Sequence, residues 1–241
     1  MIETRTVTLG DQSATVSLRA DKYEIPLFEQ IFGAQVFSVA RLKRAAELNK
    51  FYNFAVQMGW TPLIIDLGAN VGLSALYFSL QWPKAKVLAV EPEASNFDCL
   101  VANTLSRPQI TAFQRAASCR QEAVEISNPD TDPVGFQTRA AAGGGIGTIT
   151  VPELLQQYPM SAGFLPFMIK VDIEGYESVL FEENVDWIDA FPLMTIELHD
   201  WALPGQGTSK NFLKAIAGRD RDFVYLGENV FSIPYRLSLP I

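Results

Sequence analysis

Residues 63–72 read LIIDLGANVG, and this segment decides the fold. A short, mostly apolar run without polar alternation, such as residues 63–67, is typical of a strand that is buried on both faces of a parallel sheet. Glycines after such a strand let backbone N–H groups approach a ligand closely where a helix begins. The spacing is Gly-x-x-x-Gly, with Asn70 between the glycines and Asp66 before them, whereas dinucleotide sites use Gly-x-Gly-x-x-Gly. Because Asp66 is acidic, the turn favours a cationic ammonium or sulfonium ligand over an anionic pyrophosphate.

Short apolar runs recur after this segment, separated by stretches of helical character. We expect strands at 63–67, 86–90, 110–113, 167–171, 193–198, 223–226 and 230–233. Helices are expected at 70–82 and 93–105, and from about Glu174 and Ser209. Only residues 227–229 join the last two runs, which is too short for a crossover. The sequence therefore predicts an α/β fold with a mostly parallel seven-stranded sheet that ends in an antiparallel hairpin and carries helices on both faces.

The first 60 residues have a different pattern. Polar and apolar side chains alternate in 4–9 and 13–18 around Gly10-Asp11, which predicts a β-hairpin. From residue 25 to residue 59, apolar side chains return at helical spacing and predict one or two helices; they are Val39, Leu42, Ala46, Phe51, Phe54 and Met58. We therefore expect an N-terminal hairpin and helical cap over 1–60 and a ligand-binding domain over 61–241. Residues 128–150 are rich in Pro, Asp and Gly and predict a surface loop, either a lid or a plain insertion.

Composition narrows the classes of partner. The chain has 241 residues, 48% of them hydrophobic, and a formal net charge of −8 at pH 7. An acidic balance argues against binding to nucleic acid or to an anionic membrane. We find no apolar run near the ~18 residues of a membrane helix and no signal-peptide pattern at the start, so we expect a cytoplasmic protein. With Cys99 and Cys119 outside CxxC spacing and His199 as the one histidine, no metal is expected, and any metal would rest mainly on oxygen ligands.

A second acid follows the next predicted strand. Glu91 stands 25 positions after Asp66, at a strand end where a carboxylate can accept hydrogen bonds from both hydroxyls of a ribose. An acid before a glycine turn, combined with an acid at the tip of the second strand, suits an adenosine that carries an amino-acid tail. S-adenosylmethionine has that shape, so it is the cofactor we expect.

Four segments in order resemble the FkbM-type S-adenosylmethionine-dependent methyltransferases, whose named members O-methylate small molecules or sugars. They are residues 65–72; Glu91-Pro92 with Asn96, Phe97, Leu100 and Asn103; residues 170–177; and residues 196–199. The resemblance spans about residues 61–200 and implies a Rossmann-like class I methyltransferase fold. It also implies cofactor contacts by Asp66, Gly68, Asn70, Glu91 and Asn96, with Asp172 at the methyl-donor end.

Charged residues at the ends of two predicted central strands suggest a polar site. Lys170 and Asp172 share one strand face, and Glu197 and His199 share a face of the next. If both strands end at the same edge of the sheet, Lys170 pairs with Glu197 and Asp172 lies opposite His199. We expect His199 to act as general base near its ordinary pKa of about 6.5, with Asp172 orienting it. Glu174 is expected to cap or begin a helix rather than to take part in chemistry.

The leading hypothesis is an S-adenosylmethionine-dependent O-methyltransferase that acts on a hydroxyl of a small natural product or sugar. A nucleotide-linked oxidoreductase or epimerase on the same fold is an alternative, although the longer glycine motif is missing. A cofactor-binding protein without catalysis is a third possibility, because fold analogy does not settle function. The expected partner is a small-molecule acceptor, and the sequence carries no signal for an oligomeric state.

Overall fold

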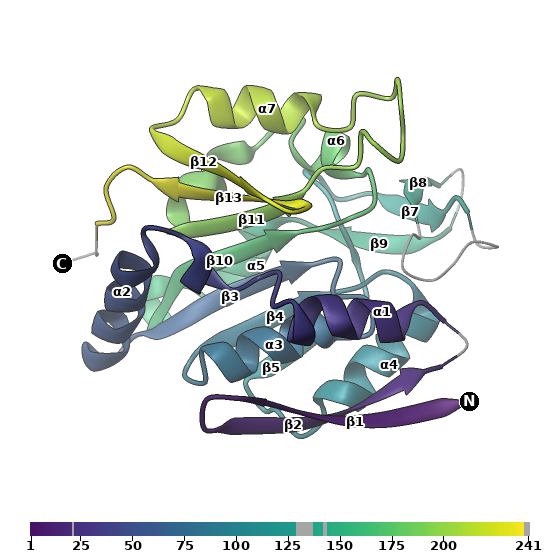
Figure 1. The fold of residues 1–241 in the computed structure, drawn as a ribbon. Helices are drawn as coiled ribbons and strands as arrows, with labels where there is room; N and C mark the ends of the chain where they lie inside the picture. The colour runs from purple at the N-terminus through teal and green to yellow at the C-terminus, as the bar shows by residue number, and fades with distance from the viewer. Residues whose placement is uncertain (21, 129–136, 142–143, 239–241) are drawn as a thin grey trace.

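The computed structural model describes residues 1–20, 22–128, 137–141 and 144–238. A seven-stranded sheet runs through its centre (Figure 1). The strand order is β12 (Arg221–Leu226), β13 (Asn229–Pro234), β11 (Leu193–Glu197), β10 (Phe164–Val171), β3 (Thr61–Leu67), β4 (Lys86–Val90) and β5 (Ile110–Phe113). Neighbouring strands from β11 to β5 are parallel, and β13 is antiparallel to both β11 and β12. The predicted mostly parallel sheet with a closing antiparallel hairpin is confirmed.

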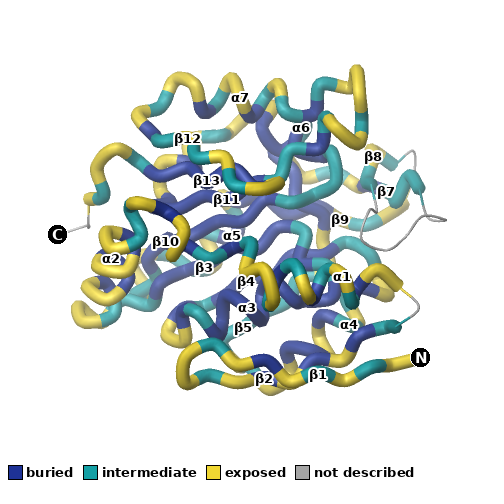
Figure 2. Tube along the Cα trace, viewed as in Figure 1, coloured by how far each residue is buried: buried dark blue, intermediate teal, exposed yellow. Residues whose placement is uncertain are grey.

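Helices cover both faces of this sheet, as predicted. The period of two along β3 sends Ile64 into one core and Leu63 and Ile65 into the other. The first core is covered by α1 (Glu24–Phe28), α2 (Ala45–Gln57), α3 (Leu73–Gln81) and α4 (Ala94–Thr104), with a π-helical turn at Glu29–Gly33 and a 3-10 turn at Val39–Arg41. The second core is covered by α5 (Val151–Gln157), α6 (Glu177–Leu180) and α7 (Lys210–Ala217), with 3-10 turns at Met160–Ala162 and Val185–Ala190. The sheet is buried almost throughout, whereas exposed segments lie on the outer helices and hairpin (Figure 2).

The N-terminal segment packs onto the first core. Strands β1 (Ile2–Leu9) and β2 (Gln12–Arg19) form the predicted hairpin, and Asn103 of α4 ties it to the turn after β3. The Asn103 amide donates to the carbonyl oxygen of Val71 at 2.9 Å and accepts from the N–H of Ser17 at 2.9 Å. These bonds connect the hairpin to the glycine turn.

The apolar face predicted for α2 is wrong in part. Phe54 and Met58 are 40% and 62% exposed, and the helix instead buries Leu48, Phe51, Tyr52 and Ala55. Spacings of three, one and three residues keep the buried set on one stripe, whereas the predicted set included a five-residue step that drifts around the helix.

A second, four-stranded sheet lies beside the carboxyl ends of the central strands (Figure 1). Its order is β6 (Ala116–Ala117), β9 (Ile146–Ile149), β7 (Ala123–Ile126) and β8 (Thr138–Ala140). The prediction of a loop over 128–150 is therefore wrong at β8 and β9, because short β-branched stretches there pair with β6 and β7. Residues 129–136 and 142–143 of that predicted loop lie outside the described residues.

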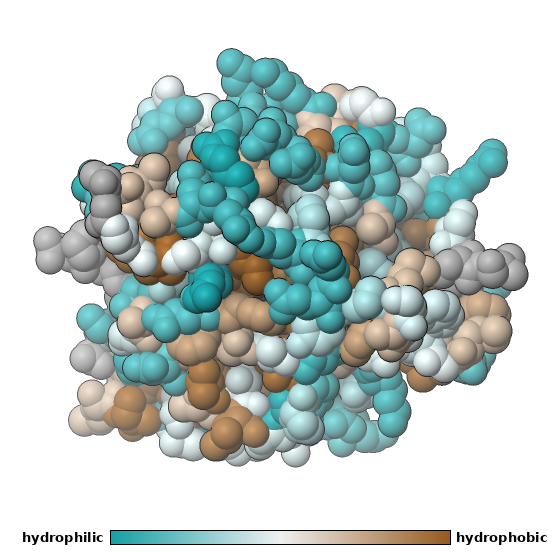
Figure 3. Space-filling view, turned by 180° about the vertical axis from the view of Figure 1, so that it is seen from behind, coloured by the Kyte–Doolittle hydropathy of each residue, from teal (hydrophilic) through white to brown (hydrophobic). Residues whose placement is uncertain are grey.

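The outer surface is mixed in character. Seen from behind, hydrophilic residues cover much of the upper part, and hydrophobic residues gather lower and toward the middle (Figure 3). None of the helices in the described ranges is long and apolar enough to span a membrane.

Candidate active site

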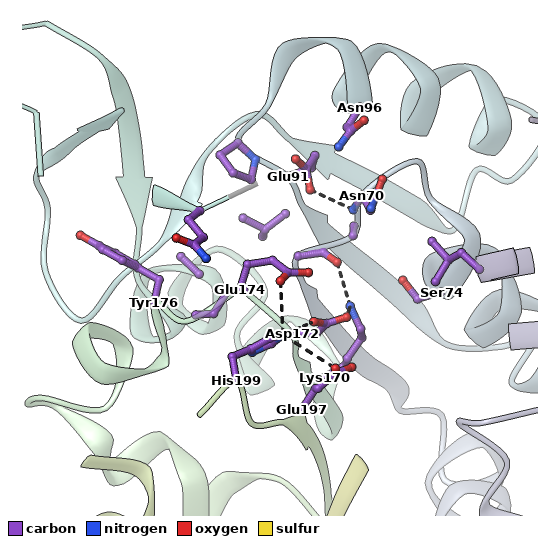
Figure 4. Close-up of a pocket in the computed structure, with 18 of the residues that line it drawn as sticks. Asn70, Ser74, Glu91, Asn96, Lys170, Asp172, Glu174, Tyr176, Glu197 and His199 are labelled. Atoms are coloured by element: carbon purple, nitrogen blue, oxygen red, sulfur yellow. Dashed lines mark hydrogen bonds and ion pairs between the residues drawn. The ribbon is translucent and has the colours of Figure 1, made fainter. Parts of the chain in front are cut away.

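A pocket of about 450 Å³ lies at the carboxyl ends of β3, β4, β10 and β11 (Figure 4). Open α/β sheets bind ligands at this edge, and small-molecule pockets typically measure ~300–1,000 Å³. The pocket is lined by Gly68 and by the polar side chains of Asn70, Glu91, Asp172, Glu174 and His199. Of the residues named from the sequence, Asn96 also lines this pocket, whereas Asp66 does not.

The turn after β3 brings two strand ends into contact. Gly68 has a φ of +76°, and a Cβ on it would lie 1.7 Å from the carbonyl oxygen of Asp172. The N–H of Asp172 donates to the carbonyl oxygen of Leu67 at 3.1 Å, which holds the segment after β10 against the turn. Gly68 is required both for its positive φ and for this close approach.

Glu91 follows β4 and is fixed by backbone donors. Its two carboxylate oxygens accept from the N–H of Asn70 at 2.9 Å and from the N–H of Glu93 at 3.0 Å. Glu91 is 5% exposed, and burial raises its pKa to about 7 despite these bonds. A carboxylate oxygen has more than one acceptor lone pair, so Glu91 can still accept from a ligand in the pocket.

Asp66 does not line the pocket, contrary to its predicted place beside an ammonium. It is fully buried, and its Oδ2 accepts from the Ser74 hydroxyl at 2.6 Å. Its Oδ1 lies 3.2 Å from the Lys170 ammonium, so Lys170 already balances the negative charge of Asp66.

The predicted pair of Lys170 with Glu197 is wrong. Lys170 lies opposite Thr195 on β11 and opposite Asp66 on β3, and its ammonium is 3.3 Å from Asp172. It also donates to the carbonyl oxygen of Gly68 at 2.8 Å. Burial lowers the pKa of Lys170, but the two aspartates outweigh it and raise the pKa overall. Lys170 therefore joins the ends of β3 and β10 rather than β10 and β11.

The Asn96 side chain reaches the pocket from α4. Asn96 is 1% exposed and lines the pocket, and its Oδ1 accepts from the Arg19 guanidinium of the N-terminal hairpin at 2.6 Å. Apolar side chains from the N-terminal segment line the same pocket, which the sequence analysis missed; they are Leu27, Ile31 and Phe37. Nothing in their spacing distinguished them from core residues.

His199 lies among four carboxylates, and Figure 4 shows three of them, Asp172, Glu174 and Glu197. Its Nδ1 is 3.0 Å from Glu177 Oε1, and the predicted proximity to Asp172 is confirmed by an Nε2 to Oδ1 distance of 3.6 Å. Nε2 is also 3.4 Å from Glu174 and 3.8 Å from Glu197. Only 2% of His199 is exposed, so these acids dominate its surroundings.

The acids around His199 oppose a role as a base near pKa 6.5, which stays a prediction. Burial lowers the pKa of His199, but the bond to Glu177 and the charges of Glu177, Asp172 and Glu174 raise it to about 10. The imidazole is therefore protonated at neutral pH and cannot accept a proton. Burial and the neighbouring Asp172 raise the pKa of Glu174 to about 8 and that of Glu197 to about 7. These carboxylates are the groups that can accept a proton near neutrality.

The sequence analysis missed Glu174 and Glu177. Helix α6 begins at Glu177, so Glu174 does not begin it; Glu174 has a φ of +55° and lines the pocket. The available signal was the recurrence of acids at 172, 174 and 177 directly after a buried strand. A left-handed conformation at a non-glycine residue is uncommon, and no sequence pattern indicated it.

No family model matches the chain, so the FkbM resemblance stays a prediction. A stretch of 42 residues is 48% identical to the methyltransferase sdnD of Sordaria araneosa, and it spans 17% of this chain and 16% of that protein.

Two solved structures illustrate the overall likeness. Fibrillarin of Aeropyrum pernix with natively bound S-adenosyl-L-methionine is 14% identical, covers 73% of this chain and 66% of its own, and has a TM-score of 0.41. The bifunctional kinase-methyltransferase WbdD is 11% identical, covers 82% of this chain and 40% of its own, and has a TM-score of 0.43. At these scores the two structures carry no argument about function. The strand order, the antiparallel β13 and the site at the strand ends give the chain the Rossmann-like α/β fold of class I methyltransferases.

Proposed function

We propose that this chain is an S-adenosylmethionine-dependent O-methyltransferase that acts on a hydroxyl of a small natural product or sugar. The observation that carries the proposal is Glu91, a buried carboxylate held by two backbone N–H groups beside the glycine turn. It lines the same pocket as the acids around His199. The match to a methyltransferase over 42 residues supports the same reaction class.

The pocket residues suit an adenosine with a cationic tail. The free lone pairs of Glu91 are placed to accept hydrogen bonds from both ribose hydroxyls. Asp172, Glu174 and Glu197 make the other end of the pocket acidic, and this charge favours a sulfonium there. Asp66 acts indirectly, because it holds Lys170 and Ser74 beside the turn. When bound, S-adenosylmethionine supplies a methyl group that an oxygen nucleophile can accept.

The acidic end also suits a hydroxyl acceptor. A methyl transfer of this kind needs close, aligned reactants, and positioning can supply several kcal/mol. An acceptor hydroxyl that donates to Glu174 or Glu197 would be held in place by that bond.

Calorimetry with S-adenosylmethionine and its demethylated product tests the cofactor part. In Glu91→Gln one acceptor oxygen becomes a donor, so at least one charged hydrogen bond to the ribose is lost, about 1.5 to 3 kcal/mol. We expect affinity to fall about 10- to 100-fold. Asp98→Asn removes an exposed acid from α4 and serves as the control with unchanged affinity. Equal affinities in the two folded variants, or binding of NAD in place of S-adenosylmethionine, would contradict the proposal.

Turnover tests the chemical part. Protein incubated with methyl-labelled cofactor and a panel of sugars and hydroxylated small molecules should give products one methyl group heavier, with the label on oxygen by NMR. Label on nitrogen would overturn O-methylation. Tight cofactor binding without any labelled product across the panel would favour a non-catalytic binding protein.

A further inference from the structure

The group around the Nε2 atom of His199 is more than a set of acids. We call Asp172, Glu174, Glu197 and His199 the acid–histidine cluster. One ligand atom from each of Asp172, Glu174 and His199 can be chosen so that all three atoms lie within 4.8 Å of one another. The fourth member contributes Glu197 Oε1, 3.8 Å from Nε2. All four residues line the pocket, so their free atoms face a space that a ligand can enter.

The histidine supplies the independent observation. His199 is 2% exposed, and within the described ranges its Nε2 has contacts at 3.4–3.8 Å to three carboxylates but no hydrogen bond. Glu177 Oε1 accepts from the N–H of Ile173 at 3.2 Å and lies 3.0 Å from His199 Nδ1, so Nδ1 is the nitrogen that carries a proton toward it. Metal-binding histidines are commonly held by a carboxylate in this way. An ion at this position takes the place of the proton that Nε2 carries when no ion is bound, so ion binding releases one proton.

The distances fit one shared ion. Ligands at about 2.1 Å in octahedral geometry are about 3.0 Å apart when adjacent and about 4.2 Å apart when opposite. The separations of 3.4, 3.6 and 3.8 Å from Nε2 to Glu174, Asp172 and Glu197 exceed the adjacent distance by about 0.4 to 0.8 Å. Small side-chain movements would therefore bring all four atoms onto a single ion.

The charges of the side chains around the cluster also favour a bound cation. The two carboxylate oxygens of Asp172 have different neighbours. Oδ2 lies 3.3 Å from the Lys170 ammonium, and Oδ1 lies 3.6 Å from His199 Nε2. Lys170 is shared with Asp66, so it does not neutralise Glu174 or Glu197. Glu177 adds a further carboxylate behind the imidazole. Asp172, Glu174 and Glu197 are half-buried, and with Glu177 they outnumber the cations beside them even when His199 is protonated, so a bound cation would relieve their repulsion.

We propose that the acid–histidine cluster binds one divalent cation that prefers oxygen ligands, Mg²⁺ or Mn²⁺. Three carboxylates with a single imidazole and no thiolate suit these ions better than zinc or copper. This replaces our expectation of no metal. The ion's place in the pocket suits binding of the acceptor's hydroxyl oxygen, and this part of the proposal rests on the proposed function.

Titration of the EDTA-treated whole chain with Mn²⁺, followed by electron paramagnetic resonance of the free ion, tests the site without cofactor or acceptor. We expect one Mn²⁺ per chain, displaced by excess Mg²⁺. Glu174→Gln should weaken Mn²⁺ binding at least 10-fold. Glu177→Gln changes the residue that contacts the imidazole and the N–H of Ile173 from behind the cluster, and it should weaken Mn²⁺ binding about 10- to 100-fold. Glu228→Gln removes a carboxylate that lines the same pocket outside the cluster and should change affinity less than threefold.

Failure to bind Mn²⁺ stoichiometrically, or equal affinities in all three variants, would overturn the site. Calorimetry with S-adenosylmethionine in EDTA verifies that each variant is folded, and it tests the proposed function separately. Cofactor binding without Mn²⁺ binding removes only the cation proposal, and Mn²⁺ binding without cofactor binding removes only the proposed function. Methyl transfer at the same rate in EDTA as in Mn²⁺ would overturn the part that concerns the acceptor oxygen.

Discussion

The ends of β3 and β4 and the ends of β10 and β11 line one pocket but are built differently. At the first pair, Glu91 receives both of its protein hydrogen bonds from backbone N–H groups nearby in space. At the second pair, Asp172, Glu174 and Glu197 converge on a single imidazole, and burial together with the charge of Asp172 raises the pKa of Glu174 and of Glu197. The half of the pocket at β3 and β4 has hydrogen bonds that are already formed without a ligand. The half at β10 and β11 carries negative charge that a ligand has to balance. Four experiments sharpen or break this contrast.

Gly68→Ala should have the largest effect, because it disrupts the contact between the two halves. The added Cβ would lie 1.7 Å from the Asp172 carbonyl oxygen at a φ of +76°, so the backbone has to move. We expect unfolding to become easier by more than about 5 kcal/mol, measured by urea denaturation. Gly163→Ala is the control, since its φ of +86° is similar but nothing lies within 4 Å; it should cost about 1 kcal/mol. Equal losses would show that the close approach is unimportant.

Lys170→Met should have the next largest effect. It leaves the buried Asp66 carboxylate without its cation, which costs about 3 to 5 kcal/mol. Adding Asp66→Asn should recover much of that loss in a double-mutant cycle. Lys86→Met, a partly buried lysine of β4 that lies over the Tyr158 ring, should cost less than about 1 kcal/mol. Strictly additive losses at Lys170 and Asp66 would refute the pairing.

The pKa of His199 reports the acidic environment of the half at β10 and β11, and it makes stability depend on pH. Its folded pKa of about 10 is raised above an unfolded value near 6.5, so its contribution to stability is complete below about pH 6.5 and is lost as pH rises through 10. Because His199 is the one histidine of the chain, ¹⁵N NMR of imidazole groups reports its pKa directly. Glu177→Gln should lower that pKa by removing the strongest favourable contact. A wild-type pKa near 6.5 would restore His199 as a base and contradict the acidic environment described above.

Thr150→Ala should have the smallest effect, because it lies in neither half. The Thr150 hydroxyl accepts from the N–H of Glu153 at 3.2 Å, and Glu153 accepts from the N–H of Thr150 at 2.8 Å, a capping box at the start of α5. We expect a loss of about 1 kcal/mol in unfolding free energy and unchanged affinities for cofactor and Mn²⁺. A loss of either affinity would show that the pocket is sensitive to remote stability changes.

The two halves also differ in how far sequence could predict them. Glu91 and Gly68 were placed correctly because each directly follows an apolar run, and parallel strands end at one edge. The partner of Lys170 was predicted incorrectly. A shift of two residues in the register between neighbouring strands leaves every side chain on the same face of the sheet. Hydrophobic alternation therefore cannot distinguish Thr195 from Glu197 as its neighbour on β11.

Conformation and environment account for the remaining errors. The positive φ of Glu174 is a property of the folded loop, so a helix-start pattern was the natural but incorrect interpretation. The pKa of His199 depends on acids from the segment after β10, from α6 and from β11, which only the fold brings together. Sequence identified which residues are polar at the strand ends, but not what each one faces.

Lys170 couples ligand binding at the glycine turn to ligand binding at the acid–histidine cluster. Its ammonium lies 3.2 Å from Asp66 and 3.3 Å from Asp172 and donates to the carbonyl oxygen of Gly68, so both sides draw on one positive charge. Any occupant of the glycine turn that shifts this ammonium alters how strongly the acid–histidine cluster holds protons or cations. By linkage, filling the cluster must change the affinity of the turn by the same factor. The size of this coupling is then a property of this lysine, and it requires no movement of a domain.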